Sequence, residues 1–177
     1  MNIKKTKFKD LFVVKQKNNI DRRGLLRETF NDKILKKRFV FEYCTTSKKN
    51  VFRGFHFQTK NIQSKYVNVL KGKILDIVID LRKKSKTFGK TFSIILSKKN
   101  ALGLYIPAGF AHAYLSLDYE NIIYYKLNNY YNPKFEKGIK YNDKKLNIKL
   151  PVKKIIISKK DQNLMTLSQF KEKYKYL

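Results

Sequence analysis

Residues 64–81 read SKYVNVLKGKILDIVIDL, and this stretch decides the fold. Apolar and polar side chains alternate over residues 65–70, and residues 74–81 are mostly apolar and β-branched. The Lys-Gly-Lys sequence at 71–73 between them is a turn signal. Since side chains on a strand point alternately to its two faces, the stretch predicts two strands separated by a tight turn.

Similar patterns continue on the C-terminal side of this stretch. Four more strands are predicted at 91–96, 102–106, 111–117 and 122–127. Short strands at intervals of about 8–12 residues are typical of antiparallel sandwiches and barrels. A further apolar strand is predicted at 152–157, whereas helices are predicted only at 31–37 and 166–174, the second with Thr166 as its N-cap. The predicted fold is a mostly-β barrel of jelly-roll type with short helices near both ends.

The length and composition of the chain suit one globular domain. It has 177 residues, of which 42% are hydrophobic and 14% aromatic, so it contains enough apolar surface to form a core. It has 7 Gly and 3 Pro and no Ser/Gly-rich or Pro-rich stretch, so no linker between domains is visible. We therefore expect residues 1–177 to form a single domain.

Nothing in the sequence directs the chain into a membrane. No run approaches the roughly 18 apolar residues of a membrane span. The start, MNIKKTKFKD, lacks the apolar core of a signal peptide. The lone Cys44 cannot form an internal disulfide, which suits a reducing compartment. We expect a cytoplasmic protein with no membrane partner.

The chain is strongly basic, with 41 Lys and Arg against 13 Asp and Glu and a formal net charge of +28. One interpretation is a polyanionic partner such as nucleic acid, an anionic membrane or a phosphorylated small molecule. The other is a solvated surface whose composition follows AT-rich codons. Only six of the cationic residues are Arg, which nucleic-acid readers prefer, and the lysines are scattered along the chain. This distribution favours the second interpretation and argues against a specific nucleic-acid partner.

The chain has two histidines, His56 and His112. No His-x-His or Cys-rich spacing accompanies them, so we expect no catalytic metal. Strand alternation predicts that His56 shares a face with Gly54 and Gln58, opposite Arg53. His112 lies between two alanines. Either histidine alone is compatible with a hydrogen-bonded core residue, but two of them among small neighbours favour a functional pocket.

Other polar groups lie within or beside the predicted strands. Asp76 and Asp80 interrupt an apolar strand on the same face, which predicts that they point into a polar lumen or into solvent. Tyr125 offers a phenol next to Lys126, although most tyrosines of β proteins serve packing. The segment 158–161 follows an apolar run and is predicted to place a charged pair at the mouth of the barrel.

Several separated motifs together resemble the dTDP-4-dehydrorhamnose 3,5-epimerase family. The motifs are RGFHFQ at 53–58, SKYVNVLKGKILDIVIDLRKKSKTFGK at 64–90, IPAGFAHAYLSL at 106–117 and YYKLNNYYNPKFEKGIKYND at 124–143. The resemblance extends upstream to DRRGLLRETF at 21–30 and downstream to LNIKLP at 146–151 and ISKKD at 157–161. Because several motifs occur in the correct order over most of the chain, the resemblance is more specific than one short pattern.

The resemblance implies a cupin-like jelly-roll barrel, a homodimer, and an enzyme that needs no metal or redox cofactor. It implies that His56 is the general base, that Asp161 orients this imidazole, and that Tyr125 is the general acid on the other face of the sugar. It also implies contacts with a nucleotide-diphosphate sugar from a set of mostly charged residues, namely Arg23, Glu28, Arg53, Lys65, His112, Glu136 and Lys160.

The implied reaction is epimerisation at C3 and C5 of dTDP-4-dehydro-6-deoxy-D-glucose to dTDP-4-dehydro-L-rhamnose. The family usually has a Gln-x-Asn pair where this chain has Phe41 and Tyr43. Aromatic rings cannot form the hydrogen bonds of amides, so we expect different substrate contacts there. The alternatives are a 3-epimerase or 3,4-ketoisomerase acting on another 4-keto sugar, and a basic module that binds nucleic acid or glycans.

Overall fold

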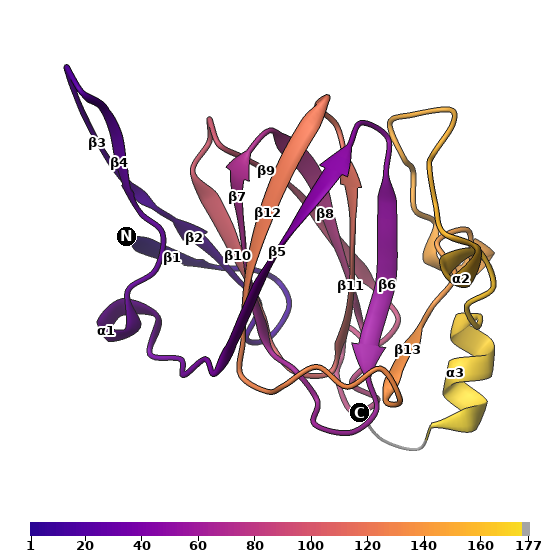
Figure 1. Cartoon of the computed structure of the whole chain (residues 1–177). Coiled ribbons are helices and arrows are strands. Elements are labelled where there is room, and N and C mark those ends of the chain that lie inside the picture. Colours follow the sequence, from indigo (N-terminus) through magenta and orange to yellow (C-terminus); the bar gives the residue numbers. More distant parts are fainter. Residues whose placement is uncertain (175–177) are drawn as a thin grey trace.

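The computed structural model describes residues 1–174, in which two large β-sheets pack face to face (Figure 1). The six-stranded sheet has the spatial order β1 (Asn2–Lys5), β2 (Phe12–Lys15), β10 (Leu102–Ile106), β7 (Lys65–Lys71), β12 (Glu120–Leu127) and β5 (Phe41–Lys48). The five-stranded sheet has the order β13 (Glu136–Gly138), β6 (Phe52–Gln58), β11 (Phe110–Ser116), β8 (Lys73–Asp80) and β9 (Thr91–Ser97). All named strand pairs are antiparallel. The mostly-β jelly-roll fold expected from the sequence is confirmed.

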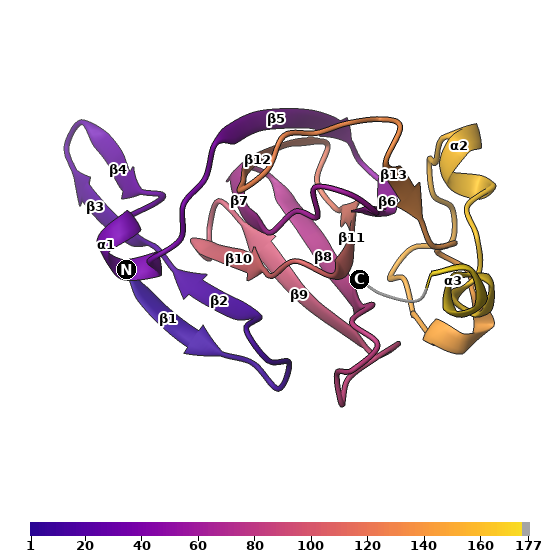
Figure 2. The same cartoon turned by 90° about the horizontal axis from the view of Figure 1, so that it is seen from below.

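The remaining elements lie at the two ends of the sandwich. Strands β3 (Lys17–Asp21) and β4 (Gly24–Glu28) form a hairpin that pairs with neither sheet. The short helices are α1 (Asp32–Leu35), α2 (Lys159–Gln162), α3 (Leu167–Lys173) and a 3₁₀ turn at Lys144–Leu146. In Figures 1 and 2 the hairpin projects from one end of the molecule together with α1, while α2 and α3 lie at the opposite end.

The two strands of residues 64–81 form as predicted, but in different sheets. β7 pairs with β10 and β12, whereas β8 pairs with β11 and β9. The turn between them crosses from one sheet to the other at Gly72, whose φ is 81°. A Cβ at Gly72 would lie 2.4 Å from the Glu120 carbonyl oxygen, so this crossing requires glycine.

The apolar sequence of β8 reflects burial on both faces. Ile74 and Val78 belong to the core between the two sheets. Ile77 and Ile79 point to the other face, where they pack with Phe170 of α3 and with other residues of the C-terminal third of the chain. A strand covered on both sides reads as a nearly continuous apolar run, which explains ILDIVIDL.

The helix predictions are confirmed in position. α3 begins after Thr166, which caps it in a capping box with Gln169. In the predicted 31–37 segment only one turn forms, α1, because the chain leaves the helix at Lys36 in the left-handed region with φ 50°.

The predicted strand at 152–157 is wrong. Within residues 1–174, its ladder contact is a single bridge from Ile156 to Val51. The next part of the β6 edge pairs with β13 instead, and the chain turns at Ser158 into α2. Residues Val152, Ile155 and Ile157 pack against the cluster that covers the five-stranded sheet, so the apolar pattern reflects packing and not strand pairing.

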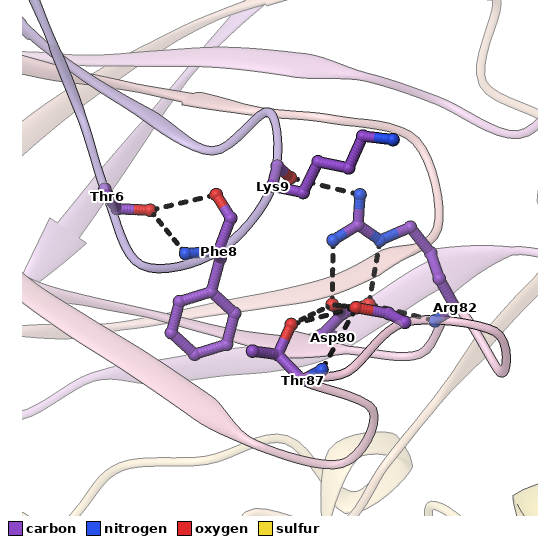
Figure 3. A network of polar contacts seen from close by, with 7 residues as sticks. Thr6, Phe8, Lys9, Asp80, Arg82 and Thr87 are labelled. Atoms are coloured by element: carbon purple, nitrogen blue, oxygen red, sulfur yellow. Dashed lines mark hydrogen bonds and ion pairs between the residues drawn. The ribbon is translucent and has the colours of Figure 1, made fainter.

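Asp80 ends β8 in a buried polar network, shown in Figure 3. Its carboxylate accepts hydrogen bonds from Arg82 Nε at 2.9 Å, Ser85 Oγ at 2.7 Å and Thr87 Oγ1 at 2.6 Å. Arg82 in turn donates to the Lys9 carbonyl oxygen at 3.1 Å. The network therefore ties the loop after β8 to the segment between β1 and β2.

Candidate active site

A cavity of about 730 Å³ opens between the two sheets. The six-stranded sheet contributes Phe41, Tyr43, Thr45, Lys65 and Tyr125 to its lining. The five-stranded sheet contributes Arg53, His56, Gln58, His112, Tyr114 and Glu136. The segment around α2 adds Ser158, Lys160 and Asp161. The cavity thus gathers polar side chains from two facing walls, and eight of the ten predicted site residues are among them.

His56 forms an ion-pair-type contact with Asp161 at one side of the cavity. The imidazole Nε2 lies 2.8 Å from Asp161 Oδ1, and the Gly54 amide donates to Asp161 Oδ2 at 3.2 Å. Ser158 caps α2 and so places Asp161, whose side chain is almost buried. Burial raises the pKa of the Asp161 carboxyl, but the contacts with His56 and Gly54 outweigh it and lower the pKa below 3.8. The carboxylate is therefore charged at neutral pH and orients the imidazole.

A bulge in β6 brings Arg53 to the same side as His56, and the predicted alternation is wrong at this point. His56 pairs with His112, whereas Arg53 pairs with Tyr114. Three steps along β6 therefore match two along β11, which is the extra residue of a β-bulge. Because the bulge places the side chains of Arg53 and His56 on the same face of β6, both line the cavity.

A second carboxylate lies on the other side of the His56 ring. Glu136 Oε1 is 3.9 Å from His56 Nδ1. Glu136 forms an ion pair with Lys160, and Tyr131 Oη donates to it at 3.1 Å. Burial raises the pKa of the Glu136 carboxyl, but Lys160, His56 and Tyr131 together lower it below 4.5. Together these contacts place a charged pair beside His56 at the mouth of the cavity.

Lys65 and Tyr125 belong to the facing sheet. Burial lowers the pKa of the Lys65 ammonium from 10.5 to about 8, against the attraction of Glu136 and Asp76. Tyr125 is 3% exposed, and burial raises the pKa of its phenol well above 10. A cation and a protonated phenol therefore face the imidazole of His56 across the cavity at neutral pH.

His112 forms a second His–Asp contact at the inner end of the cavity. Its Nε2 lies 2.8 Å from Asp76 Oδ2, and both side chains are buried. The sequence left open whether Asp76 and Asp80 point into a polar lumen or into solvent. Both side chains are 0% exposed, so neither points into solvent. Asp76 is the partner of a cavity-lining histidine, whereas Asp80 lies at the end of β8 in the network with Arg82.

Two predicted substrate-binding residues lie outside this cavity. Arg23 is exposed on the β3–β4 hairpin and pairs with Asp21 at 2.7 Å. Glu28, at the end of the same hairpin, accepts from Asn31 Nδ2 at 2.9 Å. Neither lines the cavity that holds His56.

Two tyrosines of the cavity were missed in the sequence. Tyr114 follows His112 by two residues on β11, so strand alternation was sufficient to find it. Tyr131 lies in the irregular segment after β12, where no periodicity marks the direction of a side chain.

Residues 1–174 were expected to bind no metal and to cross no membrane. No group of three or more His, Cys, Asp or Glu residues there is arranged to bind a metal ion, and the expectation of a metal-free reaction stays a prediction. None of the helices in this range has the length and apolar composition for a membrane crossing.

Comparisons with known proteins agree with the motifs. The family model for dTDP-4-dehydrorhamnose 3,5-epimerase matches residues 5–169. The chain is 39% identical to the Shigella flexneri dTDP-4-dehydrorhamnose 3,5-epimerase over 92% of its length and 94% of the relative's. It is 37% identical to the enzyme of the same name from Methanothermobacter thermautotrophicus, over 93% and 94% of the two chains.

Solved structures give the same result. The dTDP-4-dehydrorhamnose 3,5-epimerase of Elizabethkingia anophelis superimposes with a TM-score of 0.89 at 36% identity and covers 98% of both chains. The dTDP-6-deoxy-D-glucose-3,5-epimerase of Legionella pneumophila, solved in complex with dTDP-4-keto-L-rhamnose, gives 0.91 at 35% identity over 94% and 93%. With the family model spanning most of the sequence and these relatives matching nearly end to end, the chain belongs to the dTDP-4-dehydrorhamnose 3,5-epimerase family of isomerases.

Proposed function

We propose that this chain inverts C3 and C5 of dTDP-4-dehydro-6-deoxy-D-glucose to form dTDP-4-dehydro-L-rhamnose, with residues 1–177 acting as a single epimerase domain. One observation carries the proposal. The paired His56–Asp161 side chains and the buried phenol of Tyr125 come from opposite walls of one cavity that is large enough for a hexose. Inversion requires one group that removes a proton from one face of a carbon and another that returns a proton to the opposite face.

His56 acts as the base. The C4 ketone of the substrate acidifies the hydrogens at C3 and C5, because the electron pair left by proton removal is delocalised onto the ketone oxygen. His56 takes the proton, and the C–H electron pair becomes part of the enolate. The Asp161 carboxylate at 2.8 Å stabilises the imidazolium that forms.

Lys65 stabilises the enolate, and Tyr125 completes the inversion. A buried ammonium opposite the base is suited to the negative charge that develops on the C4 oxygen. Tyr125 donates its phenolic proton to the carbon from the other face as the enolate collapses back to the ketone. The Tyr125 tyrosinate then takes a proton from solvent, and the His56 imidazolium releases its proton to solvent. Each inversion therefore involves no net uptake or release of protons.

The remaining charged side chains of the cavity are proposed to bind the nucleotide sugar. Arg53 and Lys160 are exposed and provide hydrogen-bond donors, and the ring of His112 offers a further polar contact. Cationic side chains there suit a diphosphate, which forms charge-assisted hydrogen bonds. Glu136 lies between Lys160 and His56 and is proposed as a further substrate contact.

A homodimer would give Arg23 and Glu28 a role in substrate binding. Both lie on the β3–β4 hairpin, outside the cavity of their own chain. The hairpin also exposes apolar side chains, with Ile20 78% and Leu26 66% exposed. Exposed apolar groups on a projecting hairpin suit an interface with a second copy, whose cavity the charged side chains would then reach. A cytoplasmic location stays a prediction.

The test is incubation of the purified protein with dTDP-4-dehydro-6-deoxy-D-glucose in heavy water. The expected result is deuterium at C3 and C5, with the L-rhamno configuration of the product by NMR. Deuterium at C3 alone would instead indicate a 3-epimerase, and a shifted ketone would indicate a ketoisomerase. The absence of exchange at both carbons would refute the proposal.

The base is tested by His56→Ala. This variant is expected to lose exchange at both carbons while its circular dichroism spectrum stays that of the wild type. Exchange at the wild-type rate would exclude His56 as the base.

A further inference from the structure

Tyr43 lies directly against Tyr125. The two residues are register partners on the antiparallel strands β5 and β12, so their side chains share the face that lines the cavity. Their ring centroids are 4.7 Å apart with an interplanar angle of 21°, which is a stacked arrangement. Stacked aromatic pairs stabilise each other beyond the effect of the area they bury.

The Tyr125 ring is held from two directions. Tyr43 covers one side, and His112 meets the ring edge-on with centroids 6.1 Å apart and an angle of 66°. His112 is itself held by Asp76 at 2.8 Å. The phenol therefore has a defined direction before any substrate binds.

Among residues 1–174, Tyr43 supplies the ring that is stacked on Tyr125. β5 is the edge strand of the six-stranded sheet, so no further strand lies beyond it. The neighbouring Phe41 ring contacts Tyr43 and Tyr130, at 5.8 and 6.0 Å, and among residues 1–174 the ring stacked on Tyr125 is Tyr43. Removal of the Tyr43 ring would open one face of Tyr125 to the cavity.

We propose that Tyr43 is a positioning residue, whose stacked ring holds the Tyr125 phenol in the direction from which it protonates the carbon. The inference rests on the proposed function and extends it by one residue. Proton transfer to carbon depends steeply on the distance and angle of the donor, so a tilted phenol returns the proton less often. His56 then returns solvent deuterium to the face it deprotonated, which gives exchange with retained configuration. The ring of Tyr43 is required for this role, and its hydroxyl is not.

The test compares two products of the same reaction in heavy water, namely inverted and retained deuterated sugar. In Tyr43→Leu the ratio of inverted to retained product is expected to fall by about 10–100-fold, the scale of a misplaced catalytic group. In Tyr43→Phe, which keeps the ring, it is expected to stay within about twofold of the wild type, because stacking does not require the hydroxyl. Because the ratio counts only active molecules, partial unfolding of a variant does not change it.

The matched control is Tyr105→Leu. Tyr105 is also stacked, on Phe12 at 5.9 Å and 19°, but belongs to a separate cluster that does not line the cavity. This control is expected to leave the ratio unchanged. A wild-type ratio in Tyr43→Leu, or an equal loss in Tyr43→Phe, would overturn the inference.

A second measurement needs no substrate. In protein labelled in its tyrosine rings, loss of the Tyr43 ring current is expected to shift the Tyr125 resonances and to speed its ring flips in Tyr43→Leu but not in Tyr43→Phe. Unchanged Tyr125 signals in Tyr43→Leu would refute the positioning role. If the wild type showed no exchange, the proposed function would fail, while this measurement would still report on the stack.

Discussion

Lys65 is a cation in a place that disfavours its charge. Burial lowers its pKa from 10.5 to about 8. Since the proposed stabilisation of the enolate requires the charged form of Lys65, kcat/KM is expected to fall as pH rises through about 8. The Tyr125 phenol titrates well above 10, so the alkaline limb reports Lys65. In Lys65→Arg the guanidinium stays protonated, so the fall in kcat/KM is expected to move to higher pH. Initial rates measured as a function of pH test this.

The lowered pKa of Lys65 also affects the free energy of unfolding. The folded pKa of Lys65 is lower than the unfolded value, so between pH 8 and 10.5 the unfolded chain binds more protons than the folded one. The free energy of unfolding is therefore expected to rise with pH across this window in the wild type and to rise less in Lys65→Met. For the kcat/KM profile, an alkaline limb that stays at the same pH in Lys65→Arg would contradict the proposal that this limb reports the titration of Lys65.

The carboxylate of Asp161 is expected to matter for rate more than for folding. In Asp161→Asn the imidazole of His56 loses the negative partner at 2.8 Å, so the imidazolium formed in the reaction is less stable. Solvent exchange into the substrate is expected to slow by on the order of 100-fold or more. Mass spectrometry of the sugar in heavy water measures this rate.

Glu120→Gln is the control for Asp161→Asn. Glu120 forms an exposed ion pair with Lys71, far along β12 from Tyr125, and does not line the cavity. Its removal is expected to leave the exchange rate unchanged. Wild-type exchange in Asp161→Asn would show that His56 needs no carboxylate partner.

At the scale of elements, the end of β8 depends on the buried charge of Asp80. Its carboxyl pKa is raised by burial but lowered further by the hydrogen bonds from Arg82, Thr87 and Ser85, so the net shift is below 3.8. Asp80→Asn leaves Arg82 without its charge partner and is expected to reduce the free energy of unfolding by about 3 kcal/mol. Urea denaturation at neutral pH measures this difference.

The pH dependence of that difference follows from the direction of the shift. Because the pKa of Asp80 is lower in the folded chain, its carboxylate stabilises the fold above pH 3.8. This stabilisation is lost as the pH falls through the folded pKa. The gap between wild type and Asp80→Asn is therefore expected to shrink below pH 3.8. A loss below about 1 kcal/mol, the scale of an exposed pair such as Lys71–Glu120, would contradict the role of the network.

At the scale of the whole molecule, the projecting hairpin is the feature that the proposed dimer explains. Leu26→Asp places a charge on a side chain that is 66% exposed on this hairpin. If the hairpin lies in the interface, burial of that charge is unfavourable, and the variant is expected to sediment as a monomer with reduced kcat/KM. Analytical ultracentrifugation beside the sugar assay measures both.

Tyr119→Asp is the control for the dimer. Tyr119 is 85% exposed in the turn before β12 and is not part of the hairpin, so Tyr119→Asp is expected to leave the oligomeric state unchanged. A wild-type protein that sediments as a monomer, or a fully dimeric Leu26→Asp, would exclude the hairpin interface.

Local patterns in the sequence were sufficient for the six consecutive strands β7 to β12 and for α3. Both boundaries of the strand predicted at 102–106 agree with β10, and the strand predicted at 91–96 ends one residue before β9 does. These predictions succeed because alternation and capping depend on neighbours along the chain. The strand at 152–157 failed because packing on a sheet and pairing within it require the same apolar side chains.

By itself, the sequence determined the β architecture, the family and the chemical groups of the site, since period-two patterns and ordered motifs are local properties of a chain. Only the tertiary structure decided that β7 and β8 lie in facing sheets, that a bulge brings Arg53 beside His56, and that Tyr43 stacks on Tyr125. The physical reason is that strand register and sheet partners depend on contacts between residues far apart in the chain, which no local pattern specifies.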